Sequence, residues 1–191
     1  MNSLFDFFIL YIYTLKKTIM NLKIRSESQS DYSSITLVNE LAFGQQNEGI
    51  LVEKLRKKQN YNKELSLVAL LSAEVVGHIL FFPVSIDDGV SQHPTLALAP
   101  VSVLPDFQNL GIGTQLIKTG LKKSADVGFQ SVIVLGHPGY YHKFGFKPAS
   151  LFDIKAPLEV ADEVFMALEL VQGSLSGISG VVVYPNEFRD V

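Results

Sequence analysis

The chain has 191 residues, of which 47% are hydrophobic and 18% charged, and its formal net charge is −3. This length suits one domain with a substantial core, and the apolar content excludes a mainly disordered chain. The 16 basic residues form no stripe that could neutralise a row of phosphates, so nucleic acid is not an expected partner. Cysteine is absent, which excludes disulfides, Cys-ligated metal and a thiol nucleophile.

The first twenty residues contain an almost wholly apolar run, residues 4–15, followed by two lysines. The run contains Asp6 and is shorter than the roughly 20 residues that a spanning helix needs. A secretory signal carries its positive charge before the apolar run, so we expect a cytoplasmic protein with no membrane partner. The run is either a weak interfacial anchor or a tail upstream of a natural start at Met20. The second interpretation is favoured, with residues 1–20 as an extension and 21–191 as one domain.

Hydrophobic periodicity predicts the elements of the first half of the chain. A short apolar/polar alternation indicates an edge strand, and two amphipathic runs indicate helices, the first after the hydroxyls of Ser28 and Ser30 and ended by Gly44. Three β-rich runs separated by turn residues then predict consecutive antiparallel strands. The expected elements are a strand at 22–26, a helix that buries Ile35, Val38, Leu41 and Ala42, a helix at 48–58, and strands at 65–71, 75–84 and 95–103.

The apolar spacing changes from two to about 3.6 residues after Val103, which indicates a strand that leads into a helix. A short apolar strand follows, then a brief helix and two closing strands. These elements are expected at 110–128, 131–135, 140–144, 164–170 and 180–184. The predicted fold class is α+β, with a mixed sheet flanked by helices.

The turn between this strand and helix contains Gly111 and Gly113. The first turn of a helix has unpaired backbone N–H groups and a partial positive charge, and glycines there let a pyrophosphate approach closely. Two glycines that only permit tight packing are the alternative. The segment does not fit the dinucleotide-binding fingerprint, because Leu116 stands where the third glycine is required. It does not fit a P-loop either, because no lysine precedes Thr114.

The segment Gln108-Asn109-Leu110-Gly111-Ile112-Gly113 resembles the pyrophosphate loop of the GNAT superfamily of N-acetyltransferases, Gln/Arg-x-x-Gly-x-Gly/Ala. The resemblance extends over about residues 22 to 190. It includes Pro105-Asp106-Phe107-Gln108 before the loop, Gly77-His78-Ile79, the segment Tyr140-Tyr141-His142-Lys143-Phe144-Gly145-Phe146, and Phe165-Met166-Ala167-Leu168-Glu169-Leu170. The most similar branch is a bacterial group of predicted acetyltransferases with poorly defined substrates. It implies a mostly antiparallel central sheet with helices on both faces.

The resemblance also implies acetyl-coenzyme A as co-substrate. Its pyrophosphate would bind at Gln108, Asn109, Leu110, Gly111, Ile112, Gly113 and Thr114. Its pantetheine arm would pair, as a pseudo-strand, with Val101 and Val103. Pro100 lacks an N–H group, so it marks a bulge or an edge in that strand. The bulge could aim a neighbouring N–H at the thioester carbonyl, although a simple distortion of the strand edge is the alternative.

Transfer of an acetyl group to an amine requires a proton for the leaving thiolate. Tyr141 aligns with the tyrosine that family members place beside the sulfur, and a phenol is protonated at neutral pH. Tyr141 is therefore the candidate proton donor. Two alternatives are that Tyr140 is the donor, and that both rings only pack against the sheet.

The general base is not identified by the sequence. Many relatives carry a Glu on the strand before the loop, but residues 95–103 contain no carboxylate. Glu48 and His78 are alternatives, each with a purely structural explanation as well. His137 and His142 are read as loop residues, and we expect no metal.

We therefore expect an acetyltransferase in which a primary amine attacks the thioester directly in a ternary complex, since no covalent nucleophile is evident. The acceptor is expected to be a small-molecule or peptide amine, whose identity the sequence does not give. A homodimer is compatible with the sequence. Two rivals are a module that binds or senses acyl-coenzyme A without turnover and a nucleotide-dependent oxidoreductase. The missing strand Glu favours the sensing module, and Tyr141 argues against it.

Overall fold

The computed structural model describes residues 21–190, so the extension predicted at residues 1–20 lies outside the described residues. The helices in this part are α2 (Tyr32–Phe43), α3 (Asn47–Arg56), α4 (Ile112–Asp126) and α5 (Pro138–Tyr141). The strands are β1 (Lys23–Ser26), β2 (Ser66–Leu71), β3 (Glu74–Asp87), β4 (Gln92–Val103), β5 (Ser131–Leu135), β6 (Lys147–Pro148), β7 (Ile154–Lys155), β8 (Phe165–Glu169) and β9 (Gly180–Val183). No helix among the described residues is long and apolar enough to cross a membrane.

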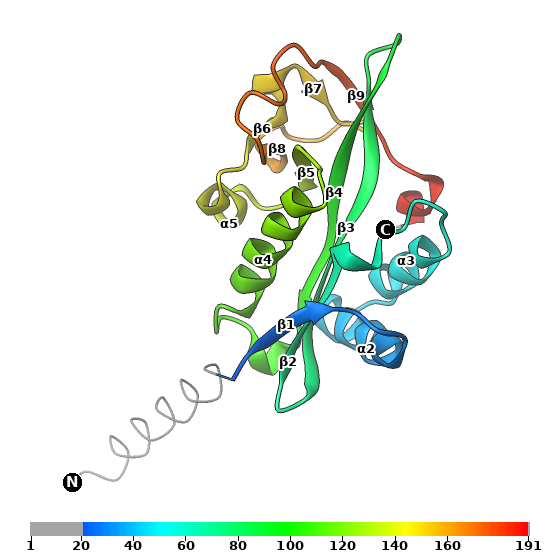
Figure 1. Ribbon diagram of the computed structural model, residues 1–191, viewed down its shortest axis with the longest axis vertical. Coiled ribbons are helices and arrows are strands. Elements are labelled where there is room, and N and C mark those ends of the chain that lie inside the picture. The colour runs from blue at the N-terminus through cyan, green and yellow to red at the C-terminus, as the bar shows by residue number, and fades with distance from the viewer. Residues whose placement is uncertain (1–20, 191) are drawn as a thin grey trace, which may run out of the picture.

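One mixed sheet contains all of these strands, in the order β1-β2-β3-β4-β5-β8-β6 (Figure 1). Strand β9 pairs with the far end of β3, at Ser85 to Asp87, and with β7. Among the strands of residues 21–190, only the pairs β4–β5 and β7–β9 are parallel. The expected α+β fold with a mostly antiparallel sheet is therefore confirmed.

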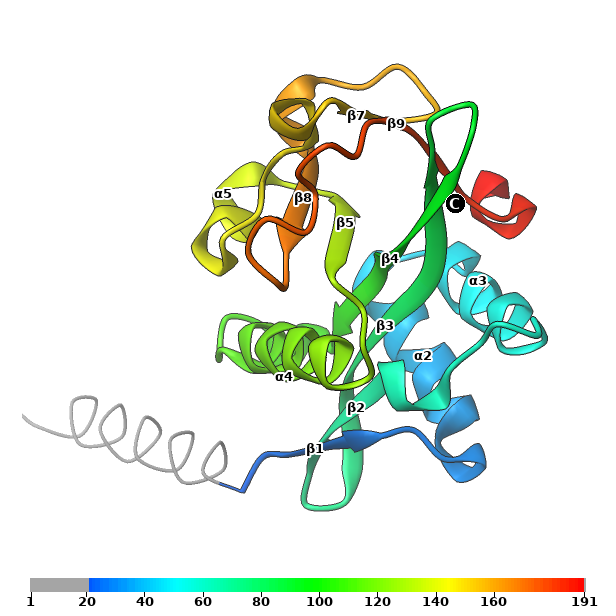
Figure 2. The same cartoon turned by 45° about the horizontal axis from the view of Figure 1, so that its top comes forward.

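Helices cover both faces of the sheet and define two apolar cores (Figures 1 and 2). Helices α2 and α3 bury Ile35, Leu51 and Leu55 against one face. Helix α4 buries Leu116 and Ile117 against the other face. The expectation that Leu41 faces the core is wrong, because α2 contacts the sheet through Ile35, Val38 and Asn39 and leaves Leu41 49% exposed.

The predicted elements agree with the structure except in the segment after β5. The brief helix expected from residue 140 begins earlier, as α5 at Pro138, and is followed by a separate 3₁₀ turn at His142–Phe144. Proline is favoured in the first turn of a helix because its missing N–H group has no partner there. Pro138 was therefore the signal for the earlier start.

The strands β4 and β5 separate along their length, and this separation positions the site. Their parallel pairing consists of Leu96 with Val132 and Ala97 with Ile133. Beyond Ala97 the strand β4 bulges, since Leu98 lies opposite Phe81 while Val101 lies opposite Ile79, and the Ala99–Pro100 peptide bond is cis. The bulge predicted at Pro100 is thus confirmed. The two strands diverge toward their C-terminal ends, from which the glycine-containing turn and α5 begin.

Candidate active site

A cavity of about 1000 Å³ lies where β4 and β5 separate. Its walls come from α3, from residues 97–101 of β4, from β5 and α5, and from the segment 181–189. Most of the lining side chains are apolar. Because the gap between the strands passes through the sheet, groups from both faces reach the same space.

Backbone N–H groups of β4 point into this gap. The N–H of Leu104 donates to the carbonyl of Val76 at 2.9 Å. Leu104 and Val76 are therefore a hydrogen-bonded pair. Hydrogen-bonded and non-hydrogen-bonded pairs alternate along antiparallel strands, so the next hydrogen-bonded pair is Ser102 with His78 of β3. Val101 and Val103 therefore direct their N–H groups away from β3, to the side from which β5 has departed. An extended ligand could pair with them as an added strand.

The turn after β4 presents a series of free backbone N–H groups. Within the described part of the chain, none of the N–H groups of residues 109–114 donates to a backbone carbonyl, and the first bond of α4 runs from Gln115 to Gly111. Gly111 has φ +84°, a left-handed conformation that glycine adopts without strain. The side-chain amide of Gln108 donates to the carbonyl of Val103 at 3.1 Å, which ties the turn to the strand. This geometry suits an anion.

Three side chains converge at the start of α4. The hydroxyl of Tyr140 lies over Gly113, where an added Cβ would come within 2.8 Å of it. The ammonium of Lys143 donates to the Thr114 hydroxyl at 3.2 Å and lies 3.9 Å from the centre of the Tyr140 ring. Lys143 was not among the site residues expected from the sequence. Its position inside the Tyr140–Phe146 segment was the signal available.

Tyr141 lines the cavity and is 8% exposed. Its ring packs edge-on against Tyr140 and Phe146, with centroid distances of 5.3 and 5.7 Å. Gly136 makes room for it, because a Cβ there would overlap the ring. Burial, and then the neighbouring Tyr140, raise the pKa of Tyr141, so it is a neutral phenol at physiological pH.

Glu48 reaches the same cavity from the first turn of α3 and is 7% exposed. Its Oε1 accepts a hydrogen bond from the side-chain amide of Gln45 at 2.9 Å. Its Oε2 is buried and has no hydrogen-bond partner among the described residues. The two candidates for the general base are Glu48 and His78, and of these Glu48 lines the cavity.

Comparison with known proteins identifies the family. Residues 33–146 match the profile of the "Acetyltransferase (GNAT) family". This chain belongs to the GNAT acetyltransferase family. It is similar to two proteins of Escherichia coli (strain K12). The "Uncharacterized N-acetyltransferase YjhQ" is 35% identical over 133 residues, covering 70% of this chain and 74% of YjhQ. The "Uncharacterized N-acetyltransferase YhbS" is 29% identical over 167 residues, covering 87% and 98%.

Two solved structures of GNAT proteins are similar over most of the chain. The crystal structure of YhbS from Escherichia coli in complex with CoA superposes with a TM-score of 0.82 at 28% identity, covering 88% of this chain and 92% of that one. The crystal structure of a GNAT family acetyltransferase from Brucella melitensis in complex with acetyl-CoA has a TM-score of 0.70 at 34% identity, covering 87% and 97%. Together with the family match, they confirm the GNAT resemblance and fold.

The structure of this GNAT chain makes His78 unsuitable as a catalytic base. His78 is 0% exposed and is not among the residues that line the cavity. Burial lowers its pKa to about 3, so the imidazole is neutral. Its Nε2 lies 2.9 Å from the Ser66 hydroxyl, which donates to Glu27, and its Nδ1 lies 3.4 Å from the Asn39 amide. A neutral imidazole with Nε2–H satisfies all of these contacts.

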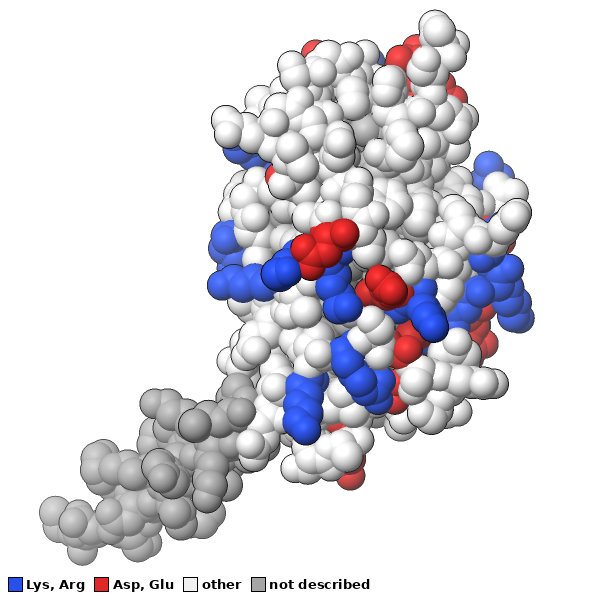
Figure 3. Space-filling model, viewed as in Figure 1, with Lys and Arg blue, Asp and Glu red and all other residues white. Residues whose placement is uncertain are grey.

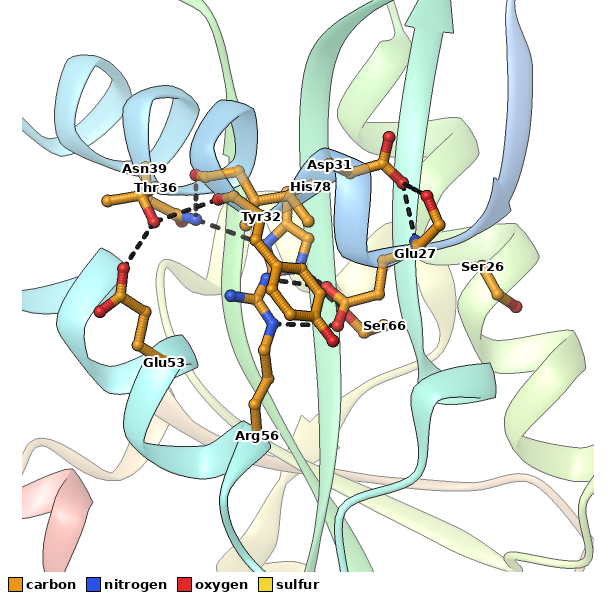
Figure 4. A network of polar contacts seen from close by, with 12 residues as sticks. Ser26, Glu27, Asp31, Tyr32, Thr36, Asn39, Glu53, Arg56, Ser66 and His78 are labelled. Carbon is orange, nitrogen blue, oxygen red and sulfur yellow. Dashed lines mark hydrogen bonds and ion pairs between the residues drawn. The ribbon is translucent and has the colours of Figure 1, made fainter.

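Glu27 is the centre of this buried network, between Arg56, Ser66 and His78 (Figure 4). Arg56 bonds both of its carboxylate oxygens, at 3.0 and 2.8 Å, and Tyr61 donates to it as well. Burial alone would raise the pKa of Glu27, but the hydrogen bonds from Arg56, Tyr61 and Ser66 outweigh it and lower the pKa. The network attaches α3 to β2 and β3, and so holds the helix that carries Glu48.

The two histidines of the α5 region have different surroundings. His137 lines the cavity, whereas His142 is exposed and does not line it. Among the described residues, no group of three or more His, Asp or Glu side chains could hold a metal ion.

Charged residues of both signs are interspersed on the face seen in Figure 3. They gather in the middle and lower parts of this view. The surface over β7 and β9 is mostly uncharged in this view. The cavity itself is lined mostly by apolar side chains, which favours a ligand with an apolar body over a highly charged one.

Proposed function

We propose that this chain transfers the acetyl group of acetyl-coenzyme A to a primary amine by direct attack in a ternary complex. The observation that carries the proposal is the gap between β4 and β5. Free N–H groups of Val101 and Val103 lie along the gap, the turn with the free N–H groups of residues 109–114 lies at its end, and the Tyr141 phenol lines the cavity. Both solved relatives described above contain coenzyme A or acetyl-coenzyme A, which supports this donor.

The turn at residues 108–114 would hold the pyrophosphate. Its free N–H groups and the partial positive charge of the 15-residue helix α4 both favour negative charge. Lys143 adds a full positive charge beside Thr114. The pantetheine arm would then extend along β4 toward the cavity, pairing with the N–H groups of Val103 and Val101.

Tyr141 would act on the leaving group. When the amine nitrogen bonds to the thioester carbon, the carbon–sulfur bond breaks and the sulfur gains negative charge. Tyr141 lines the cavity, where its hydroxyl would donate its proton to the sulfur. Its raised pKa keeps it protonated until that moment.

Two measurements on the purified full chain test the proposal. Calorimetric titration should show binding of acetyl-coenzyme A that is competed by coenzyme A and not by NADH. A thiol-release assay with pooled primary amines should then show amine-dependent liberation of coenzyme A. Binding without release for any amine would favour the sensing module, and the absence of acetyl-coenzyme A binding would refute the proposal.

A further inference from the structure

One oxygen of the buried Glu48 carboxylate lacks a hydrogen-bond donor among residues 21–190. Glu48 is 7% exposed, and its Oε1 accepts a hydrogen bond from Gln45. Oε2 is buried with no hydrogen-bond partner in the described part of the chain. Such a group costs free energy unless a donor completes its surroundings. It is retained here in the wall of a cavity, where a ligand can supply that donor.

The position of Glu48 is opposite to that of Tyr141 across the sheet. Glu48 comes from α3, which covers the face shared with α2, while Tyr141 belongs to the core on the α4 face. Both line the cavity that passes between β4 and β5. A thioester in this gap would therefore have a carboxylate on one side and a phenol on the other.

The rest of the cavity wall contains few groups that could compete with Glu48 for an ammonium ion. The other ionisable residues that line it are Tyr141, Tyr184, His137 and Arg189. None of these carries a negative charge at neutral pH. The remaining lining residues are apolar side chains or glycine, such as Phe43, Leu51 and Phe188.

We propose that Glu48 binds the amino group of the acceptor and is the general base, and that the acceptor is a primary amine on an apolar body. This inference rests on the proposed acetyl transfer. Rotation about the terminal torsion of Glu48 can present either oxygen to the cavity. In the reaction, Glu48 first takes one proton from the bound ammonium and releases it to solvent. The neutral amine nitrogen then bonds to the acetyl carbon, the carbon–sulfur bond breaks, and the second proton passes from the nitrogen to Glu48. Tyr141 gives its proton to the thiolate, and exchange with solvent then restores both residues.

The test compares Glu48→Gln with Glu53→Gln. Gln is close in shape to Glu but cannot accept the proton or pair with an ammonium as an anion. Glu53 lies on the same helix, is exposed, and accepts a hydrogen bond from the Thr36 hydroxyl at 2.9 Å. The probes are phenethylamine as an apolar amine and spermidine as a polar one, with thiol release followed from pH 6 to 10.

We expect wild type to acetylate phenethylamine in preference to spermidine. Glu48→Gln should lower kcat/KM at pH 7 by about 10²- to 10⁴-fold, the usual contribution of a general base. Its rate should then rise about tenfold per pH unit up to the pKa of the amine, because free amine must come from solution. Affinity for acetyl-coenzyme A should be unchanged, and Glu53→Gln should behave as wild type.

A binding readout separates this inference from the proposed function. Protein saturated with coenzyme A is titrated with phenethylamine, and binding should weaken at least tenfold in Glu48→Gln even if no turnover occurs. Equal phenethylamine affinity in wild type and Glu48→Gln, with equal rates and pH profiles, would overturn the role of Glu48. Preference for spermidine would overturn the apolar class of acceptor. Thermal unfolding checks folding, and the melting temperature of Glu48→Gln should not fall, since the substitution removes a buried unpaired charge.

Discussion

The hydroxyl of Tyr140 lies over Gly113, because a Cβ added at Gly113 would be 2.8 Å from Tyr140 Oη and 4.0 Å from the ring carbon Cζ. The two glycines of the turn are thus needed for different reasons. Gly111 has a left-handed backbone and open space around its Cα, whereas Gly113 is helical and leaves room for a neighbouring side chain. The ring of Tyr140 in turn packs against Tyr141, so a displacement of one ring would reach the other.

Gly113→Ala should be rescued by removal of the Tyr140 hydroxyl. The single substitution should lower the free energy of unfolding by about 1 kcal/mol, the lower end of the cost of overpacking. In the double variant Gly113→Ala/Tyr140→Phe the nearest ring atom would be at ordinary contact distance, so most of that loss should disappear. Urea unfolding of the four forms of this double-mutant cycle measures the coupling.

Gly111→Ala is the matched control for that rescue. It should cost about 1–2 kcal/mol because alanine is strained in the left-handed region, and Tyr140→Phe should not restore the loss. Rescue of both alanine variants, or of neither, would contradict the assignment of separate roles to the two glycines.

Tyr141→Phe should lower kcat by about 10²-fold or more while leaving affinity for acetyl-coenzyme A unchanged, because only the proton donor is lost. The change is measured by thiol release at saturating donor and, separately, by calorimetric titration of acetyl-coenzyme A. Tyr140→Phe is the control, and its kcat should stay within about threefold of wild type, well short of a proton donor's contribution. A larger loss in Tyr140→Phe than in Tyr141→Phe would assign the donor to Tyr140 instead.

Lys143→Met should weaken binding of acetyl-coenzyme A by about fivefold, which corresponds to about 1 kcal/mol for an exposed charge pair. The difference from wild type should shrink as salt is raised from 50 mM to about 500 mM, because exposed charges are screened. Lys147→Met, which removes an exposed lysine on β6, should bind as wild type does. A salt-independent loss would show that Lys143 acts through ring packing rather than charge.

The stability of the protein should fall with acidification because of His78. Its pKa is lowered from 6.5 to about 3 in the folded state, so between these values the unfolded chain binds more protons than the folded one. Stability is then fully present above pH 6.5 and decreases as the pH falls toward 3. The His78 contribution should be about 1.5 kcal/mol smaller at pH 5 than at pH 6.5.

Urea unfolding at a series of pH values measures this slope. His78→Gln should flatten it between pH 6.5 and 5, whatever its effect on absolute stability, whereas His142→Gln should leave it unchanged because His142 is exposed. An unchanged slope in His78→Gln would mean that the acid sensitivity has another source. Below about pH 4.5 protonation of Glu27, whose pKa is also lowered, should reduce stability further.

The sequence by itself determined the order of the main helices and strands, the turn at Gly111, a break in the strand ladder at Pro100 and the resemblance to the family. Each of these depends on local chemistry. Residue spacing sets whether a segment forms a helix or a strand, and proline cannot donate to a strand ladder whatever surrounds it. The first N–H groups of any α-helix are free because no helical carbonyl precedes them, so this feature also needs no tertiary contact.

Only the tertiary structure showed that Glu48 lines the cavity and that His78 does not. Both were isolated ionisable residues in predicted elements, and nothing near them in the sequence distinguished an enclosed side chain from one that lines a cavity. Packing of α2 and α3 on the sheet encloses His78 between Ser66 and Asn39, while the separation of β4 from β5 opens a cavity beside Glu48. Burial and convergence arise from contacts between segments far apart in the chain, and these contacts exist only once the sheet has formed.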